Sequence, residues 1–234
     1  MKHEAEQHRA KLVRFLVAGG VTLGMLMSQD LWFSVERQLP RVALLTPLNN
    51  MPGELDLLLA VMVLVGCAVF AVLPAYRVAG GITALSAGLM LAALDQLRWQ
   101  PWCYQYWLTI LILLPLGSLR ANSLRCMNLV RWISIATYLW SGLHKCNHGF
   151  AQFYGSWVQQ DFLTQSPAAL RPLIESGYWI AGPLEILIGI LFLILASRRI
   201  AVVLACTLHL AILLLLGPVF NGDNPVILPW NVVM

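Results

Sequence analysis

Apolar runs bounded by charged residues, proline or glycine dominate the pattern of this chain. Seven runs reach or approach the ~20 residues that an α-helix needs to cross a bilayer. They cover Lys11–Ser28, Leu55–Pro74, Val78–Leu94, Tyr104–Gly117, Met127–Lys145, Gly177–Ser197 and Ile200–Gly217. The fourth is short and contains Pro115, so its helix is expected to be short or bent. The pattern predicts an all-α, polytopic integral membrane bundle of about seven transmembrane helices.

The amino-acid composition supports the same class. Of the 234 residues, 59% are hydrophobic and 11% are charged, whereas about 25% of the residues in soluble domains are charged. This composition excludes an ordinary soluble domain and a disordered chain. The net charge of +4 comes from scattered arginines without a basic cluster interleaved with aromatic residues. No nucleic-acid partner is therefore expected, and the lipid bilayer is the expected surrounding.

The positions of lysine and arginine predict the orientation in the membrane. With the N-terminus in the cytoplasm, ten of these side chains lie inside and five outside. Glu4 and Glu6 interrupt the basic start, so the first helix is expected to remain uncleaved. The outer connections Asp30–Glu54 and Cys146–Ser176 are expected to combine short interfacial helices with turns. No linker or repeat divides the chain, which predicts one domain over residues 1–234.

Two ionisable residues lie in the middle of apolar runs. Glu185 interrupts the sixth run and His209 the seventh. A charge within a span costs roughly 2.5–3.5 kcal/mol, so both side chains are expected to face the bundle interior. Either they have a function there, or Glu185 is a hydrogen-bonded structural carboxyl group and His209 a neutral imidazole bonded to a neighbouring helix.

The densest group of polar residues ends the fifth run. On a helix, Tyr138, Ser141, Lys145 and His148 follow one stripe at offsets 0, 3, 7 and 10. This stripe is expected to enter the membrane from outside. Lys145 either extends its ammonium group to the interface or is desolvated, in which case a neutral amine becomes available as a base.

Two further pairs lie on the predicted outer side. His144 and His148 have the i, i+4 spacing of a zinc motif. They lack a nearby carboxylate and a third ligand, and Lys145 would repel a cation, so no metal site is expected. Cys103 and Cys146 would be able to form a disulfide in an oxidising compartment if their Cα atoms approached closely.

The segment before the fourth run concentrates hydrogen-bonding groups and aromatic rings, including Asp95, Trp99 and Trp102. Such a mixture suits a pocket for a small aromatic ligand or a lipid headgroup. It equally suits a helix–helix turn within the aromatic belt of a membrane protein.

The order of several residues along nearly the whole chain resembles a known family. It is similar to the transmembrane core of the vitamin K-dependent gamma-carboxylases and of the bacterial horizontally transferred transmembrane (HTTM) proteins. The matching residues are Arg14-Phe15-Leu16, Leu94-Asp95 with Trp99, Tyr138, Gly142-Leu143-His144-Lys145, Glu185 with Gly189, and His209.

This resemblance implies a membrane enzyme, expected in a bacterial inner membrane, in which Lys145 deprotonates a quinol of the vitamin K or menaquinol type. Oxygenation of the quinol anion then yields a base that removes the gamma proton of a glutamate, which is carboxylated. The implied catalytic residues are Lys145, His148 and Tyr138, and the implied cofactor-binding residues are Asp95, Trp99, Trp102, Glu185 and His209.

The chain departs from the carboxylase pattern at two positions and at its end. His144 stands where the carboxylases have the first lysine of a pair, and Trp102 stands where they have an assisting histidine. The carboxylases continue into substrate-gripping segments, whereas this sequence stops at Met234, which is expected of a minimal form or of a truncated chain.

Two functional hypotheses follow from these observations. The first is a quinol-dependent, proton-abstracting membrane enzyme with Lys145 as its base. The second is a non-catalytic membrane subunit or scaffold that binds a lipid or quinone. A transporter is less favoured, because no symmetry-related pair of broken helices is visible.

Overall fold

The computed structural model describes residues 2–33, 41–117, 123–150, 152, 163–216 and 227–233. All regular elements within these ranges are helices. The chain divides into two compact units, with the boundary between Val130 and Arg131. Each unit is described by itself.

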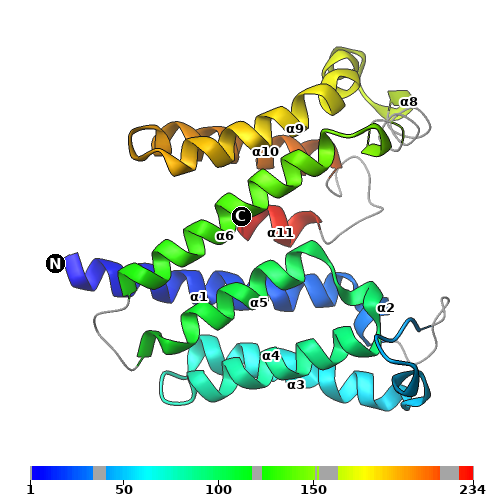
Figure 1. The fold of residues 1–234 in the computed structure, drawn as a ribbon, viewed down its shortest axis with the longest axis vertical. Coiled ribbons are helices and arrows are strands. Elements are labelled where there is room, and N and C mark those ends of the chain that lie inside the picture. Colours follow the sequence, from blue (N-terminus) through cyan, green and yellow to red (C-terminus); the bar gives the residue numbers. More distant parts are fainter. Residues whose placement is uncertain are drawn as a thin grey trace. The chain divides into compact units, whose positions relative to one another are not determined.

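The N-terminal unit is built on three long helices (Figure 1): α1 (Lys2–Met27), α3 (Gly53–Val72) and α4 (Arg77–Leu94). Its other elements are α2 (Gln29–Trp32), η1 (Thr46–Asn50), η2 (Gln96–Arg98), α5 (Pro101–Leu113), η3 (Leu114–Gly117) and the beginning of α6 (Ser123–Lys145). Helix α1 packs against α3 and α5. Helices α3 and α4 form an antiparallel pair with a close contact at glycine, since a Cβ atom at Gly66 would lie 2.7 Å from the carbonyl oxygen of Gly80.

The C-terminal unit contains the rest of α6 and two long helices, α9 (Arg171–Leu193) and α10 (Arg198–Leu216), which pack against each other. Its shorter elements are α8 (Leu163–Gln165), η6 (Ala168–Leu170), η7 (Leu195–Ser197) and α11 (Ile227–Val233). Tyr138, Ile188 and Ala205 form a buried core that joins α6, α9 and α10. Apolar side chains of α9 and α10 surround this core.

Each of the seven predicted apolar runs holds a helix. Within the described ranges, four helical stretches are long and apolar enough to cross a membrane: His8–Met27, Gly53–Val72, Arg77–Leu94 and Leu195–Leu214. A bent pair, Ala168–Gly177 with Trp179–Leu193, would make a fifth. Helix α5 has 13 residues, a rise of roughly 20 Å, as expected for the short fourth run. The count of seven crossings and the side of the N-terminus remain predictions.

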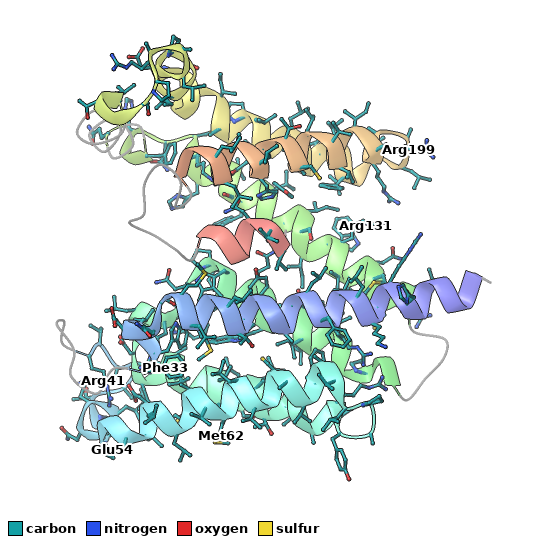
Figure 2. All side chains as sticks on the ribbon, turned by 180° about the vertical axis from the view of Figure 1, so that it is seen from behind. Phe33, Arg41, Glu54, Met62, Arg131 and Arg199 are labelled. Atoms are coloured by element: carbon teal, nitrogen blue, oxygen red, sulfur yellow. The ribbon has the colours of Figure 1, made fainter. Side chains whose placement is uncertain are left out.

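The described parts of the two predicted outer connections contain short helices. Helix α2 and η1 lie in the first connection, while α8 and η6 lie in the second. Residues 34–40, 151 and 153–162 of these connections are outside the described residues. Near the first connection, Figure 2 shows Phe33, Arg41 and Glu54 gathered where α3 begins.

Candidate functional site

Lys145, the last residue of α6, forms an ion pair with Glu185 of α9. Its Nζ atom lies 2.9 Å from Glu185 Oε1, 2.7 Å from Glu185 Oε2 and 2.6 Å from Ser141 Oγ. A lysine ammonium group has three N–H donors and no acceptor. The three oxygens therefore match the three donors of the charged form.

This ion pair is largely shielded from solvent by the protein. The side chain of Glu185 is 8% exposed and that of Lys145 is 25% exposed. A carboxylate with so little exposure is costly unless a partner neutralises it. Lys145 and Glu185 therefore depend on each other within the helical bundle.

Glycines allow α6 and α9 to approach closely beside this ion pair. A Cβ atom at Gly142 would lie 2.7 Å from the carbonyl oxygen of Gly182, and one at Gly182 would lie 3.0 Å from that of Gly142. Gly142 precedes Lys145 by three residues, and Gly182 precedes Glu185 by three, so each glycine lies one turn from a charged residue. The close crossing brings the lysine within reach of the carboxylate.

A second group of polar residues joins α6, α10 and α11. The hydroxyl oxygen of Tyr138 lies 2.5 Å from His209 Nε2, and His209 Nδ1 lies 2.7 Å from Asn231 Oδ1. The Asn231 oxygen is only an acceptor, so Nδ1 carries the imidazole proton. In the neutral ring, Nε2 then accepts the proton of the Tyr138 hydroxyl group. The direction of donation is therefore Tyr138 to His209 to Asn231.

These two groups lie close enough to interact electrostatically. The charge of Glu185 acts on Tyr138 and on His209, and that of Lys145 also acts on His209. Tyr138 is buried, and its ring stacks on Phe192 with the centroids 5.9 Å apart. We call Tyr138, Ser141, Lys145, Glu185, His209 and Asn231 the polar cluster. It combines an ion pair with a hydrogen-bonded phenol and imidazole in an apolar surrounding.

The structure brings together four of the sequence-predicted site residues: Tyr138, Lys145, Glu185 and His209. His148 differs from the expected stripe, because α6 ends at Lys145 and the backbone turns before an exposed His148. The periodicity of a helix applies only as far as the helix continues.

The other three predicted residues, Asp95, Trp99 and Trp102, belong to the N-terminal unit, where each has local contacts. The buried Asp95 accepts a hydrogen bond from the Leu97 amide and so caps η2. Trp102 is buried against Trp32, with ring centroids 5.9 Å apart. Trp99 is exposed and lies edge-on to another indole of its unit.

The sequence analysis did not identify two buried polar residues, Asn231 and Arg98. Asn231 lies in α11, and no helical pattern in the sequence links it to His209. Arg98 is fully buried beside Asp95, and its NH2 atom lies 2.7 Å from Asp56 Oδ2. Arg41 also reaches that oxygen, at 3.0 Å. The position of Arg98 in a turn with other polar residues was the only signal in the sequence. Its acidic partner Asp56 is 42 residues away in the chain.

Neither the cysteine pair nor the histidine pair considered in the sequence forms a disulfide or a metal centre in the described ranges. Cys103 and Cys146 are both free thiols. His144 and His148 are exposed. Within the described part of the chain, no three His, Cys, Asp or Glu side chains are arranged to hold a metal ion.

Comparison with protein families finds a match in the region that contains most of the polar cluster. Residues 123–226 match the family model of methylamine utilisation protein MauE. The chain is an integral membrane protein, because MauE is a membrane protein and the structure contains several long apolar helices. The MauE-like region covers a little under half of the chain and includes Tyr138, Lys145, Glu185 and His209.

The match to MauE corrects the family resemblance inferred from residue order. The resemblance to gamma-carboxylases and HTTM proteins is wrong. Isolated polar landmarks in apolar helices recur between unrelated membrane proteins because few residue types are tolerated there. The comparisons with curated proteins and with solved structures found no match.

Proposed function

We propose that the C-terminal unit is a membrane-embedded acid–base site that exchanges a proton with a membrane-soluble, hydroxyl-bearing ligand of the quinol type. The observation that supports this proposal is the chain of hydrogen bonds from Tyr138 through His209 to Asn231. Ionisable groups placed within apolar helices are often functional, because their insertion is costly.

The proton relay follows from the directions of the two hydrogen bonds. A ligand hydroxyl group gives its proton to the Tyr138 oxygen while the phenol proton passes to His209 Nε2. The products are a ligand anion, a neutral Tyr138 and an imidazolium at His209. Asn231 accepts from Nδ1–H throughout.

Lys145 has a different role in this proposal from the base expected from the sequence. Ser141 and both Glu185 oxygens occupy the three donors of its ammonium form. A lysine in that form has no lone pair with which to take a proton. We therefore assign proton acceptance to His209 and treat Lys145 as a fixed positive charge that stabilises Glu185.

A quinol fits the chemistry around Tyr138. Its hydroxyl group supplies the proton, and its ring suits the apolar and aromatic surroundings formed by Phe192, Leu184 and Leu208. A lipid with a hydroxyl-bearing headgroup would use the same relay. The two ligands differ in ultraviolet absorbance, which makes them distinguishable in a binding experiment.

A non-catalytic scaffold is the second candidate, and a specific observation favours it. Lys145, Glu185, Tyr138 and His209 all have partners within the protein. Polar contacts of this kind hold helices together in membranes, at about 0.6–2 kcal/mol each. In that case the polar cluster would stabilise the C-terminal unit without acting on a ligand.

The similarity to MauE supplies a physiological setting for either candidate. MauE is by name a methylamine utilisation protein. We propose the same setting for this chain. Deletion of its gene is expected to impair growth of the host on methylamine and not on an unrelated substrate. Equal growth of the deletion strain on methylamine would reject this setting.

The proposed function is tested with the purified full chain in detergent and reduced menaquinone as the probe. Binding is followed by the ultraviolet difference spectrum, which separates the quinol from its anion. Wild type is expected to bind the quinol and form the anion, whereas Tyr138→Phe binds it without forming the anion. Tyr76→Phe is a matched control because Tyr76 is 65% exposed in the N-terminal unit.

Two results would contradict the proposal. Absence of quinol binding by wild type, together with reduced thermal stability of Tyr138→Phe and His209→Gln, would favour the scaffold. Anion formation by Tyr138→Phe equal to that of wild type would remove Tyr138 from the relay.

A further inference from the structure

Hydrogen bonds hold the segment of residues 41–51 against the end of α4 in the N-terminal unit. The Leu44 amide donates to the Ala93 carbonyl oxygen at 2.8 Å. In the other direction, the Gln96 amide donates to the Val42 carbonyl oxygen at 2.7 Å. The side-chain amide of Gln96 adds a third bond, to the Ala43 carbonyl oxygen. The segment is therefore fixed to the helices rather than free in solvent.

Arg41 joins the two ends of this segment and ties them to α3 (Figure 2). Its Nη1 atom donates to the Met51 carbonyl oxygen at 2.9 Å. Its Nη2 atom lies 3.0 Å from the buried Asp56 Oδ2, in the first turn of α3. Between the two ends, the Ala43 amide donates to the Asn49 side chain at 3.3 Å. These bonds give the segment a defined conformation, so its surface is a fixed feature of the unit.

Large apolar side chains are exposed on this segment and on η2 beside it. Leu44 is 56% exposed and Leu45 is 60% exposed, while Leu97 and Trp99 of η2 are exposed to a lesser extent. We call the exposed apolar residues of the two segments the apolar end surface: Val42, Leu44, Leu45, Met51, Leu97 and Trp99. Exposed apolar residues that gather from separate parts of a chain mark an interaction surface.

The segment is free of formal charge, which limits the chemistry of its partner. The sequence has no Asp, Glu, Lys or Arg from Val42 to Gly53, and its polar side chains there are the neutral Thr46, Asn49 and Asn50. Arg41, which precedes this stretch, is paired with Asp56. A partner therefore contacts the apolar end surface through apolar groups and neutral hydrogen bonds, without the need for a complementary charge.

The apolar end surface lies where two candidate membrane spans meet the membrane boundary. One span begins at Gly53, two residues after the segment, and another ends at Leu94, next to the Ala93 carbonyl group that the segment binds. The ends of a span lie between the hydrocarbon core and the headgroups of a bilayer. Tryptophan, here Trp99, is enriched at this level. Lipid is thus the apolar partner available to this surface.

We propose that the apolar end surface is embedded in the boundary layer of the bilayer, where it contacts the uncharged upper parts of the lipid acyl chains. Residues 41–51 then lie in the plane of the membrane, with their apolar side chains in lipid. Because the contact is apolar, its depth is expected to be the same with neutral and anionic lipids and at low and high salt. This inference concerns the N-terminal unit and does not depend on the proposed function of the polar cluster.

The experiment measures the depth of a nitroxide spin label in the full chain, reconstituted in phosphatidylcholine bilayers. Cys146→Ser and Cys206→Ser remove the exposed thiols of the described residues, and Leu45→Cys then carries the label. Relaxation by O₂, which concentrates in lipid, is compared with relaxation by a water-soluble nickel complex. The ratio of O₂ to nickel accessibility is expected to be several times larger at Leu45 than at the control Glu54→Cys, whose charged parent residue is exposed.

The other results would overturn the proposal. Equal ratios at Leu45 and Glu54 would show that the apolar end surface faces water. Protection of the Leu45 label from both reagents would show that protein, rather than lipid, covers the surface. A ratio that changes with added phosphatidylglycerol or with salt would contradict an apolar contact. If Leu45→Cys does not fold, the label is placed at Leu44→Cys, where the same outcomes apply.

Discussion

Lys145 and Glu185 are 40 residues apart in the chain, yet the lysine Nζ atom lies 2.7 Å from the glutamate Oε2 atom. Both oxygens of the carboxylate and the Ser141 hydroxyl group surround one ammonium group. An apolar helical bundle tolerates this glutamate because the opposite charge arrives from a neighbouring helix.

Removing one member of this pair should destabilise the protein more than removing both. Lys145→Met leaves a buried carboxylate without its partner, and we expect a loss of about 3 kcal/mol in the free energy of unfolding. The double variant Lys145→Met/Glu185→Leu should recover much of this loss. Denaturation in mixed detergent, followed by circular dichroism, measures the difference. Glu54→Gln is the control because Glu54 is exposed, and a double variant less stable than both single variants would contradict the expectation.

Adding one methyl group at the crossing of α6 and α9 should separate the two helices. In Gly142→Ala the new Cβ atom would lie 2.7 Å from the Gly182 carbonyl oxygen, and overpacking of this kind costs about 1–3 kcal/mol. Gly19→Ala is a matched control, since a Cβ atom there meets nothing within 4 Å. The control should gain about 0.5–1 kcal/mol from helix propensity. Equal thermal stability of the two variants would show that the crossing tolerates a larger residue.

The Asn231 amide should select the protonated nitrogen of His209. In wild type, ¹⁵N spectra of the histidine rings are expected to show one ring protonated at Nδ1, with its signal assigned by His209→Gln. In Asn231→Leu this preference should weaken, and stability should fall by about 1 kcal/mol, because the acceptor of the Nδ1 proton is lost. Val232→Ala is the control on the same helix, where the side chain is 63% exposed. An unchanged tautomer in Asn231→Leu would remove Asn231 from the relay.

Arg98 should not be replaceable by lysine. Its guanidinium group donates to the carbonyl oxygens of Leu31 and Leu91 and to Asp56, three directions that one ammonium group on a shorter stem does not reproduce. Arg98→Lys is expected to cost about 2–4 kcal/mol. Arg41→Gln should cost less, because Arg41 is the more exposed of the two arginines that pair with Asp56. Thermal unfolding of the two variants in detergent tests this order, which the opposite ranking would contradict.

Part of the polar cluster was predictable from the sequence because helical periodicity is a local property. Tyr138, Ser141 and Lys145 recur on one face of α6, and this face contacts α9 and α10 as expected for polar residues in an apolar helix. Which acidic or aromatic residue meets each of them depends on how helices cross. Tyr138 pairs with His209 rather than with a residue of its own helix, and no periodicity contains this information.

The segment that contains Asp95, Trp99 and Trp102 was not predictable from the sequence in this way. Its mixture of hydrogen-bonding groups and aromatic rings suited both a ligand pocket and a helix–helix turn. In the structure Asp95 caps η2 and Trp102 packs against Trp32, so both residues have contacts within the protein. Arg98, which has no role in the sequence analysis, is fully buried there. Its partner Asp56 lies in the first turn of a different helix.

The length and polarity of contiguous runs were enough to predict a helical membrane protein and the approximate positions of its long helices. The sequence also identified Glu185 and His209 as residues whose burial needs a reason. The pairing of Lys145 with Glu185 and that of Asn231 with His209 are visible only in the folded protein. The close crossing at Gly142 and Gly182 brings the first pair together, and such contacts between distant segments arise from packing in three dimensions.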